Sequence, residues 1–521
     1  MKSTSVRLAA AFTALALVAG ACGKDRDEAA DSTAAATTVA PATTQATTAT
    51  TAPNDATTTV DSEASDTTAA DTADTTTEST GATDTTAADT TPSTDAAADG
   101  PMFGDAPWPC SEGDGANTDD GSEVGVTADS ISIASGDDNG YAGSPGLNHE
   151  ITDAMKALVD KCNELGGING RTITMNYFDA KLLEVGPAIQ GACDGNNFFL
   201  VGEGWAFDSN QEETRLGCGL PAVPAYSVSA AFAMGKDMFQ GVPNPADETP
   251  AGTFAQLAEL FPDEVQHVGS LVGNYSATQE TRDKFVQAAP NFGWTFASTS
   301  LEYNIAGETD WTPFVKQLEE AGATSVAWSG SCLPNLQLFA QAAVANDYNV
   351  PIFTDANHYE AKCAAANTDG ALDNLYMRMA FIPFEEADVN PATKDYVDLV
   401  EGSGGEISLL GAQATSSFML WATAASECGA QLTRACTLEN LANTHSWTGH
   451  GLHAETDPGG NHPPACNIVL HLKGTAYERV EPTEPGTFAC DPSWIGAVTG
   501  TPALAAAQLD ANRISQQFTG Q

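Results

Sequence analysis

Near the C-terminal end of the sequence, four histidines form its densest group of metal-binding residue types: His445, His450, His453 and His462. Asp457 and Cys466 lie beside them, and imidazole, carboxylate and thiolate groups together can bind zinc. However, the histidine spacing does not follow the pattern of a helical ligand pair, and Pro458-Gly459-Gly460 is typical of a loop. We therefore expect no metal and no cofactor.

Covalent chemistry has no signature in this sequence either. The Gly-x-Ser-x-Gly motif and the phosphate-binding P-loop are both absent, and there is no Cys-x-x-Cys pair. Catalytic groups can meet in space without being close in sequence, but nothing here singles out a nucleophile and its base. We predict that the protein is not an enzyme.

The first residues have the layout of an export signal. Lys2 and Arg7 precede an apolar run at 8–18, which is too short to span a bilayer. The run ends in Val18-Ala19-Gly20-Ala21-Cys22, which resembles the lipobox of bacterial lipoproteins. That resemblance implies removal of a signal peptide at 1–21 and lipidation of Cys22, which would anchor the chain on the extracytoplasmic face of the cell membrane. The alternative is an ordinary secreted protein cut after Ala21.

Apart from Cys22, ten of the eleven cysteines remain, an even number that suits disulfides in an exported chain. The sequence does not fix their connectivity. Closeness along the chain favours four pairs and leaves a fifth: Cys428–Cys436, Cys193–Cys218, Cys332–Cys363, Cys466–Cys490 and, by remainder, Cys110–Cys162.

Beyond residue 125, short β-rich runs alternate with longer helical runs, and these elements would position the functional side chains. We predict strands at 130–134, 172–177, 198–201, 222–223, 268–272, 295–300, 325–328 and 352–354. We predict helices at 148–165, 186–192, 209–216, 278–289, 311–321 and 333–346. Two such series predict an α/β fold with two mostly parallel, doubly wound sheets. Ligands bind at the carboxyl ends of such strands, and two facing sheets make a cleft.

The segment Gly166-Gly167-Ile168-Asn169-Gly170-Arg171 is the most specific signal in the sequence. Its glycines can end a helix, and its Asn-Gly pair can turn the chain into a strand. As a string it resembles the signature of the leucine-binding-protein family. These are extracellular solute receptors with the type I periplasmic-binding fold, which serve branched-chain amino acid ABC transporters. Segments at 125–131, 309–313 and 322–326 also resemble the family.

The resemblance implies two lobes joined by a three-crossover hinge that closes over the ligand. The solute-binding domain would occupy 121–500, with lobe one at about 125–245 and 375–440 and lobe two at about 250–370 and 445–490. On either side we expect a Thr-, Ala- and Asp-rich disordered linker at 22–120 and a C-terminal tail at 501–521. We expect a monomer.

In the first lobe, the loop at 203–209 follows a strand and opens a helix, where free amide hydrogens suit a ligand carboxylate. Trp205, Phe207 and Ser209 are the candidate ligand contacts there. The family loop is usually small and Ser-rich, so the two aromatic residues suggest a flatter or larger ligand than a small aliphatic one. Core packing of these aromatics, and helix capping by Asp208, are the alternatives.

The next strand end carries Tyr226, Ser227 and Ser229, which resemble a family stretch whose hydroxyls and amides bind the ligand carboxylate. Val228 stands where the family has a threonine, which weakens the expectation of an α-amino acid headgroup. A turn without ligand contact is the alternative for the two serines.

In the second lobe, Tyr275, Ser331, Asp355 and Asn357 follow three predicted strands. The resemblance implies that Tyr275 forms a wall of the site and that Asp355 pairs with a ligand ammonium group through a charge-assisted hydrogen bond. A turn or capping role is the alternative for Asp355.

The charge balance excludes polyanionic partners. The 521 residues include 20 Lys and Arg against 69 Asp and Glu, which gives a net charge of −49. Nucleic acid and anionic lipid headgroups both require a basic protein surface. We therefore expect no nucleic-acid partner and a neutral, zwitterionic or cationic solute.

Together these features predict a lipid-anchored receptor that captures a small polar solute, such as an amino acid, an amide or a related carboxylate. The resemblance implies that it delivers this solute to ABC permease subunits. The alternative is a ligand-sensing ectodomain of a signalling system with the same fold.

Overall fold

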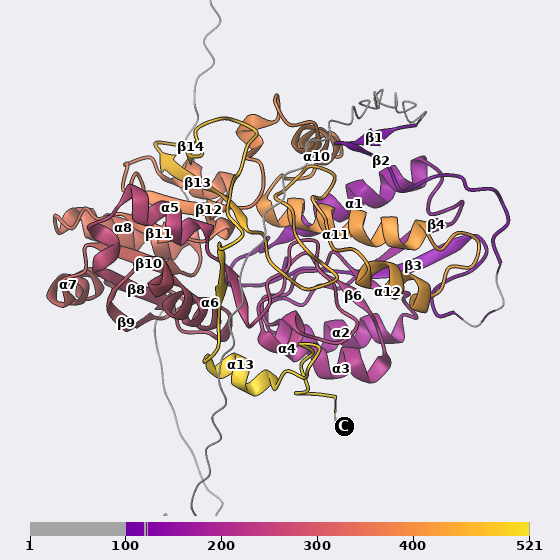
Figure 1. Cartoon of the computed structure of the whole chain (residues 1–521), viewed down its shortest axis with the longest axis horizontal. Helices are drawn as coiled ribbons and strands as arrows, with labels where there is room; N and C mark the ends of the chain where they lie inside the picture. Colours follow the sequence, from indigo (N-terminus) through magenta and orange to yellow (C-terminus); the bar gives the residue numbers. More distant parts are fainter. Residues whose placement is uncertain (1–99, 119–120, 122, 520–521) are drawn as a thin grey trace, which may run out of the picture. The chain divides into compact units, whose positions relative to one another are not determined.

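The computed structural model describes residues 100–118, 121 and 123–519 (Figure 1). The predicted signal peptide, Cys22 and most of the predicted linker lie outside the described residues. Within the part described, no helix combines the length and the apolar character that a membrane crossing needs.

The first sheet is parallel and has four strands in the order β4-β3-β5-β6. Its strands are β3 (Ser130–Ser135), β4 (Thr172–Tyr177), β5 (Leu200–Val201) and β6 (Ala222–Val223). The connecting helices are α1 (His149–Glu164), α2 (Val185–Asp194) and α3 (Glu212–Cys218), with the short helix η1 (Asp208–Asn210) before α3. All four predicted strands are confirmed, although β5 is shorter than expected.

The second sheet has eight strands in the order β14-β13-β12-β11-β10-β8-β9, with β15 paired to β13. Its parallel strands are β8 (Val268–Gly273), β9 (Phe296–Tyr303), β10 (Ser325–Ser329), β11 (Ile352–Thr354) and β12 (Leu375–Met379). Antiparallel strands complete one side: β13 (Cys466–Lys473), β14 (Ala476–Glu481) and β15 (Ala489–Cys490). Helices α6 (Ser276–Ala288), α7 (Thr312–Ala321), α8 (Gln337–Ala345) and α9 (Ala361–Ala366) connect the parallel strands. The predicted α/β architecture with two mostly parallel sheets is confirmed.

The remaining elements link or cover these sheets. They are the β1 (Met102–Phe103) and β2 (Ala106–Pro107) pair, α4 (Ala230–Ala233), β7 (Glu248–Pro250), α5 (Gly252–Leu260), α10 (Pro391–Gly402), α11 (Leu409–Ser426), α12 (Arg434–Ala442), β16 (Ile495–Ala497) and α13 (Pro502–Ala507). Strand β7 pairs with β16, and α13 packs against α4. The segment expected as a C-terminal tail therefore contains a packed helix.

We expected the chain to return to lobe one near residue 375, and this position falls on β12. This strand pairs in parallel with β11 of the larger sheet, and its Leu375, Met377 and Met379 are buried. Helix α11, which follows, contacts α1, β5 and β6 of the first sheet. The change from one sheet to the other thus comes after residue 379.

Helix α11 forms the centre of the first lobe's packing. It contacts the helices α1 and α12 and the strands β5 and β6. Most of its side chains, including Trp421, are buried. A helix that is apolar all round is stable only inside a core, which explains its long run of Ala, Leu, Met and Phe.

The Gly166–Arg171 turn joins α1 to β4. Gly167 has a φ of +76°, and a Cβ atom at this position would lie 2.0 Å from the Arg171 carbonyl oxygen, so only glycine fits. Arg171 is fully buried and donates to the carbonyl oxygens of Thr127, Gly429 and Ala430. The motif therefore fastens the start of the first sheet to the end of α11.

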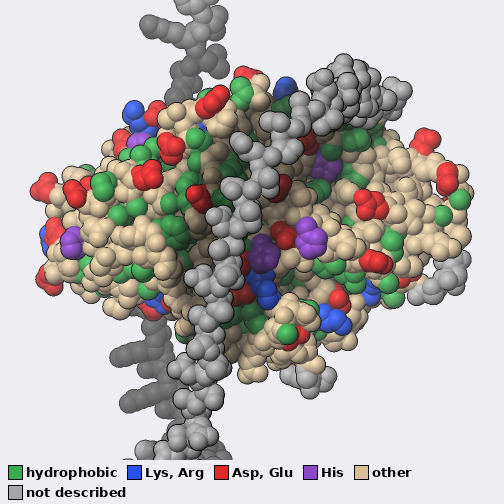
Figure 2. All heavy atoms as spheres, in the orientation of Figure 1, with side chains coloured by type: hydrophobic (Ala, Val, Ile, Leu, Met, Phe, Trp, Pro, Cys, Tyr) green, Lys and Arg blue, Asp and Glu red, His purple; other side chains and the backbone are tan. Residues whose placement is uncertain are grey.

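All five predicted disulfides are present: Cys110–Cys162, Cys193–Cys218, Cys332–Cys363, Cys428–Cys436 and Cys466–Cys490. Each joins residues that are at most 52 positions apart in the chain. Acidic side chains are spread over the face that Figure 2 shows, as the net charge of −49 requires.

Candidate ligand-binding site

A cavity of about 110 Å³ lies where segments from both lobes meet. Its polar lining includes Tyr226, Ser227, Gln240, Asn244, Arg378, Gln413 and Asn467. Its apolar lining includes Val242, Pro243, Pro250, Ala356, Ala380, Phe381, Leu409 and Pro464. The cavity thus draws on the ends of β6 and β11, on α11 and on the chain segments that run between the sheets.

Tyr226 and Ser227 follow β6 and are the two predicted site residues that line this cavity. The Tyr226 hydroxyl accepts a hydrogen bond from Asn148 Nδ2 at 3.3 Å. The Ser227 hydroxyl accepts one from Gln240 Nε2 at 2.7 Å, and the Ser227 carbonyl oxygen accepts one from Asn244 Nδ2 at 2.8 Å. Burial raises the pKa of Tyr226 well above its usual value, so this hydroxyl stays neutral.

Phe207 and Tyr275 meet across the two lobes. Phe207 follows β5 and Tyr275 follows β8, and their ring centroids lie 5.8 Å apart at an interplanar angle of 58°. This distance is typical of a favourable aromatic pair. Burial raises the pKa of Tyr275 to about 12. The structure therefore brings these two predicted residues together as one aromatic contact between the lobes.

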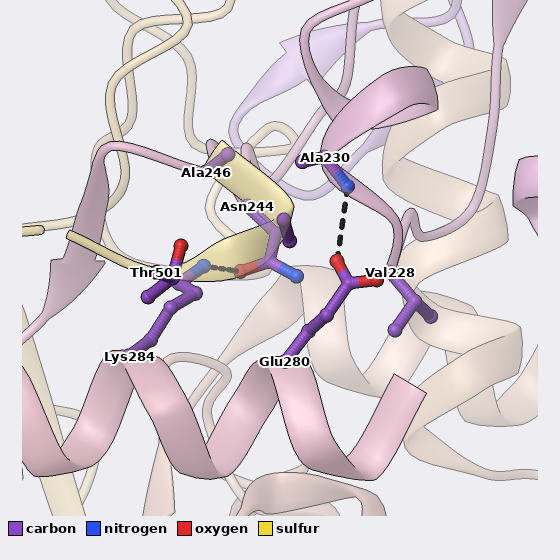
Figure 3. Close-up of a pocket in the computed structure, with 8 residues that line it drawn as sticks. Val228, Ala230, Asn244, Ala246, Glu280, Lys284 and Thr501 are labelled. Atoms are coloured by element: carbon purple, nitrogen blue, oxygen red, sulfur yellow. Dashed lines mark hydrogen bonds between the residues drawn. The ribbon is translucent and has the colours of Figure 1, made fainter. Parts of the chain in front are cut away.

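A second contact between the lobes lies beside the cavity (Figure 3). From α6, the Glu280 carboxylate accepts a hydrogen bond from the Ala230 backbone N–H at 3.1 Å. One turn further along, Lys284 Nζ donates to Asn244 Oδ1 at 2.6 Å and to the Pro245 carbonyl oxygen at 2.8 Å. Burial lowers the pKa of Lys284 to about 7. The space left between these groups is about 10 Å³, the size of one water molecule.

Many proteins have two lobes with parallel sheets and a cavity between them. A comparison with family models shows to which family this chain belongs. A family model described as a periplasmic binding protein matches residues 137–476, well over half of the chain. The chain belongs to the periplasmic binding protein family. This family consists of extracytoplasmic receptors for transported solutes and not of enzymes.

Solved structures of periplasmic binding proteins share this fold. One is the branched-chain amino acid transporter substrate binding protein from Streptococcus pneumoniae in complex with isoleucine; it is 16% identical with a TM-score of 0.55, over 68% of this chain and 100% of that chain. A leucine binding protein from Thermotoga maritima is 15% identical with a TM-score of 0.57, over 70% and 99%. A solute binding protein from R. palustris in complex with benzoate is 13% identical with a TM-score of 0.57, over 70% and 98%. These similarities confirm the predicted type I periplasmic-binding fold. A comparison with curated proteins found no significant match.

In this periplasmic binding protein, Trp205 lies away from the cavity. It is 1% exposed, packs in the core beside the first sheet, and donates from Nε1 to the Phe178 carbonyl oxygen at 3.3 Å. Ser209 lies in η1 and does not line the cavity. Of the three candidates on this loop, the structure therefore brings only Phe207 to the region between the lobes.

Asp208, on the same loop, binds the start of α4. Its carboxylate accepts hydrogen bonds from the backbone N–H groups of Val228 at 2.6 Å and Ser229 at 3.0 Å. Ser229 itself caps α4, because its hydroxyl accepts a bond from the Phe232 N–H at 3.3 Å. Burial raises the pKa of Asp208 to about 7, although these hydrogen bonds oppose the shift. The amides at this strand end are thus bonded within the chain.

The predicted ammonium partner, Asp355, forms an ion pair with Arg378. The two residues are neighbours because β11 and β12 run parallel with Thr354 opposite Met377. Arg378 lines the cavity and was not predicted. The signal that could have found it is a single arginine in the otherwise apolar strand Leu375–Met379.

Ser331 and Asn357 lie at the ends of β10 and β11 and do not line the cavity. Asn335 Nδ2 donates to the Ser331 hydroxyl at 3.4 Å, and Asn357 Nδ2 donates to the Gly330 carbonyl oxygen at 3.3 Å. Both side chains therefore have partners within the loops that follow the strands.

Three of the four clustered histidines have separate polar partners in the folded chain, and the ring nitrogens of His450 have none among the described residues. His445 contacts Asp457 at 2.8 Å, His453 contacts the Ser416 hydroxyl at 2.7 Å, and His462 contacts Glu248 at 2.8 Å. His450 is buried beside Trp447, with ring centroids 5.0 Å apart. A different group, at the start of α1, brings three side chains of metal-binding types close together: His149 Nε2 lies 3.4 Å from Glu406 and 4.0 Å from Glu150. Lys362 of the second lobe reaches Glu150 at 3.6 Å, so this group forms an ion cluster between the lobes.

Proposed function

We propose that this chain is the solute receptor of an ABC importer. In this proposal, the cavity between the lobes captures a small polar solute, such as an amino acid, an amide or a related carboxylate. Tyr226, Ser227, Phe207 and Tyr275 contribute to recognition. The lobes then present the closed complex to the permease subunits.

One observation carries this proposal: a cavity of about 110 Å³ lined by both lobes contains several polar side chains among apolar ones. Small-molecule sites typically combine an apolar wall with a few placed polar groups. Two proteins with a similar fold are known in complex with isoleucine and with benzoate, and these small ligands support the proposal of a small solute.

Attachment to the membrane through lipidated Cys22 is part of the same proposal. The lipobox-like segment Val18–Cys22 supports it. A receptor tethered by a lipid chain remains close to a permease while keeping its folded part in water. Mass spectrometry of the membrane fraction tests this point: the mature chain should begin at a diacylated Cys22, and a Cys22→Ser variant should leave the membrane.

Isothermal titration and thermal shift against a panel of amino acids, amides, organic acids and sugars test the central proposal. We expect saturable one-to-one binding of one chemical class and an increase in melting temperature with its concentration. The absence of binding across the whole panel would contradict the receptor function.

A further inference from the structure

The polar groups that line the cavity between the lobes fall into two kinds. Asn244 and Asn467 are bonded within the chain: Asn244 contacts Ser227 and Lys284 through both ends of its amide, and Asn467 Nδ2 donates to Gln256 Oε1 at 2.6 Å. Gln240 and Arg378 are different, as is Gln413, because each has polar side-chain atoms without a hydrogen bond to a described residue. Gln240 is fully buried, and Arg378 is the only charged residue among those that line the cavity. The chemistry of these two residues indicates what the solute must offer.

Gln240 is 1% exposed and its side chain lines the cavity. Its Nε2 donates to the Ser227 hydroxyl at 2.7 Å, but its Oε1 has no partner among the residues that the structure describes. A buried acceptor without a donor is costly, so such atoms in native proteins usually face a water molecule or a ligand. A solute N–H or O–H group would satisfy this oxygen.

Arg378 supplies the complementary charge. Its Nε donates to Asp355, whereas its two terminal nitrogens make no hydrogen bond to a described residue. The guanidinium group is planar and can bind a carboxylate through two parallel hydrogen bonds. Its side chain is 21% exposed and lines the same cavity as Gln240.

The start of α4 is the other place near the cavity where an anion could bind, but its donors already have a partner. The backbone N–H groups of Val228 and Ser229, at the start of α4, already donate hydrogen bonds to the Asp208 carboxylate and are not available to a solute. A solute carboxylate would have to displace a buried carboxylate to bind there. Among the described residues that line the cavity, Arg378 is the only charged one, and its terminal nitrogens are therefore the strongest donors available to an anion.

The rest of the wall limits the size of the solute. Val242, Phe381 and Leu409 give the cavity an apolar side. Its volume of about 110 Å³ is somewhat smaller than the roughly 150 Å³ of a cavity known to hold benzene. A short aliphatic or small cyclic body fits this space.

We propose that the solute is a small monocarboxylate that also carries an N–H or O–H donor, such as a zwitterionic amino acid or a 2-hydroxy acid. Its carboxylate binds the terminal nitrogens of Arg378, and its donor binds Gln240 Oε1. This assignment rests on the proposed receptor function and specifies the chemistry of its ligand.

Isothermal titration of the purified chain with four matched compounds tests this assignment: L-leucine, 2-hydroxy-4-methylpentanoate, leucinamide and 4-methylpentanoate. The first two carry both groups, leucinamide lacks the carboxylate, and 4-methylpentanoate lacks the donor. Amino acids and 2-hydroxy acids with other side chains extend the series. We expect the compounds with both groups to bind best, with about 10- to 100-fold weaker binding when the carboxylate is lost.

Two variants with matched controls identify the residues. Arg378→Gln should weaken binding of the acids about 10- to 100-fold, and Gln240→Met should remove the advantage of leucine over 4-methylpentanoate. Arg282→Gln is the control for the first, because Arg282 also donates from Nε to an aspartate, Asp283 at 2.8 Å, but lies outside the cavity. Gln211→Met is the control for the second, because Gln211 is also buried with an unpaired Oε1 and lies outside the cavity.

Both controls should leave the affinity unchanged within about twofold. Arg378→Lys keeps the positive charge but loses the planar guanidinium group, so its loss of affinity should be smaller than that of Arg378→Gln. Thermal unfolding verifies that each variant is folded. Equal binding of leucinamide and leucine, or unchanged affinity in folded Arg378→Gln, overturns the assignment while the receptor function stands. Binding of no solute of any class overturns both.

Discussion

The start of α4 and the wall formed by Gln240 and Arg378 lie in the same region between the lobes, yet they treat their polar groups in opposite ways. At α4 the backbone amides of Val228 and Ser229 are bonded by the chain's own Asp208. At the wall, Gln240 Oε1 and the terminal nitrogens of Arg378 have no partner among the described residues. The first arrangement stabilises the fold, whereas the second is available to a ligand.

This difference shows why strand ends alone do not identify a binding site. The start of α4 follows β6, and Arg378 lies near the end of β12, so both are close to the carboxyl ends of parallel strands, where ligands of such sheets bind. A helix start that is already capped by a buried carboxylate has no free donors, so its position is not enough. What marks a site is a polar atom that lines a cavity and that the chain leaves without a partner.

The largest expected effect that tests this comparison is on stability at α4. Asp208→Ala would leave two buried amides unpaired, at Val228 and Ser229, and would remove a packed side chain. We expect a loss of about 2 to 4 kcal/mol in the free energy of unfolding, measured by urea denaturation. Ser209→Ala, at the neighbouring half-buried residue, should cost less than about 0.5 kcal/mol. If the free energy of unfolding of the Asp208→Ala variant is unchanged, the start of α4 is instead a surface that is available to a ligand.

The ionisation of Asp208 gives a second test. Burial raises its pKa from 3.8 to about 7 in the folded chain, so the folded state holds a proton between about pH 4 and pH 7 that the unfolded state has released. This contribution to stability is complete below about pH 4 and is lost as the pH rises towards 7. Relative to Asp208→Asn, the wild-type protein should therefore lose stability over this range, on the order of 1 to 3 kcal/mol.

Urea denaturation of both proteins at several pH values measures this difference, and all other titrating groups cancel in it. A difference that does not change with pH would mean that the hydrogen bonds from α4 keep Asp208 ionised throughout.

The sequence predicted the features that depend on local pattern. The strands at 172–177, 222–223 and 352–354 agree with the structure to the residue. The second and third are short, fully buried runs between helical segments, and the first is an edge strand that begins with three β-branched residues. Four of the five disulfides were predictable because each joins cysteines that are close in sequence, and Cys110–Cys162, 52 positions apart, was the pair that remained. Phe207 and Tyr275 were also predicted, since both lie on loops that follow strands, and the structure places them in contact.

Pairings between distant side chains could not be predicted in this way. Asp355 has Arg378 beside it because of the register of β11 against β12, which the sequence does not reveal. Asp208 caps α4, a helix of a later βα unit, and not the helix that it begins. Gln240 reaches the cavity from a segment with no regular structure, where no periodicity shows which side chains point inwards. Each of these depends on tertiary geometry.

Arg378 should behave in the opposite way to Asp208. Its ion pair with Asp355 is partly exposed, with side chains 21% and 20% accessible, so Arg378→Gln should lower the free energy of unfolding by less than about 1 kcal/mol. Thermal and urea unfolding without solute measure this effect. In the presence of saturating solute, wild type should gain more stability than the variant, because its affinity is higher. A loss of several kcal/mol without solute would instead assign Arg378 to the structural framework.

The smallest expected effect concerns Tyr226, which stands between the two regions. Its hydroxyl accepts a long hydrogen bond of 3.3 Å from Asn148 and donates its own proton to no described residue, while Tyr226 lines the cavity. Tyr226→Phe keeps the ring and should change the free energy of unfolding by less than about 0.5 kcal/mol. Solute affinity, measured by titration calorimetry, should fall about 3- to 10-fold if this hydroxyl is one of the groups that the chain leaves for its ligand. A variant with unchanged affinity but lower stability would show that Tyr226, like Asp208, serves the closed framework, and the free polar groups of the site would then be those of Gln240 and Arg378.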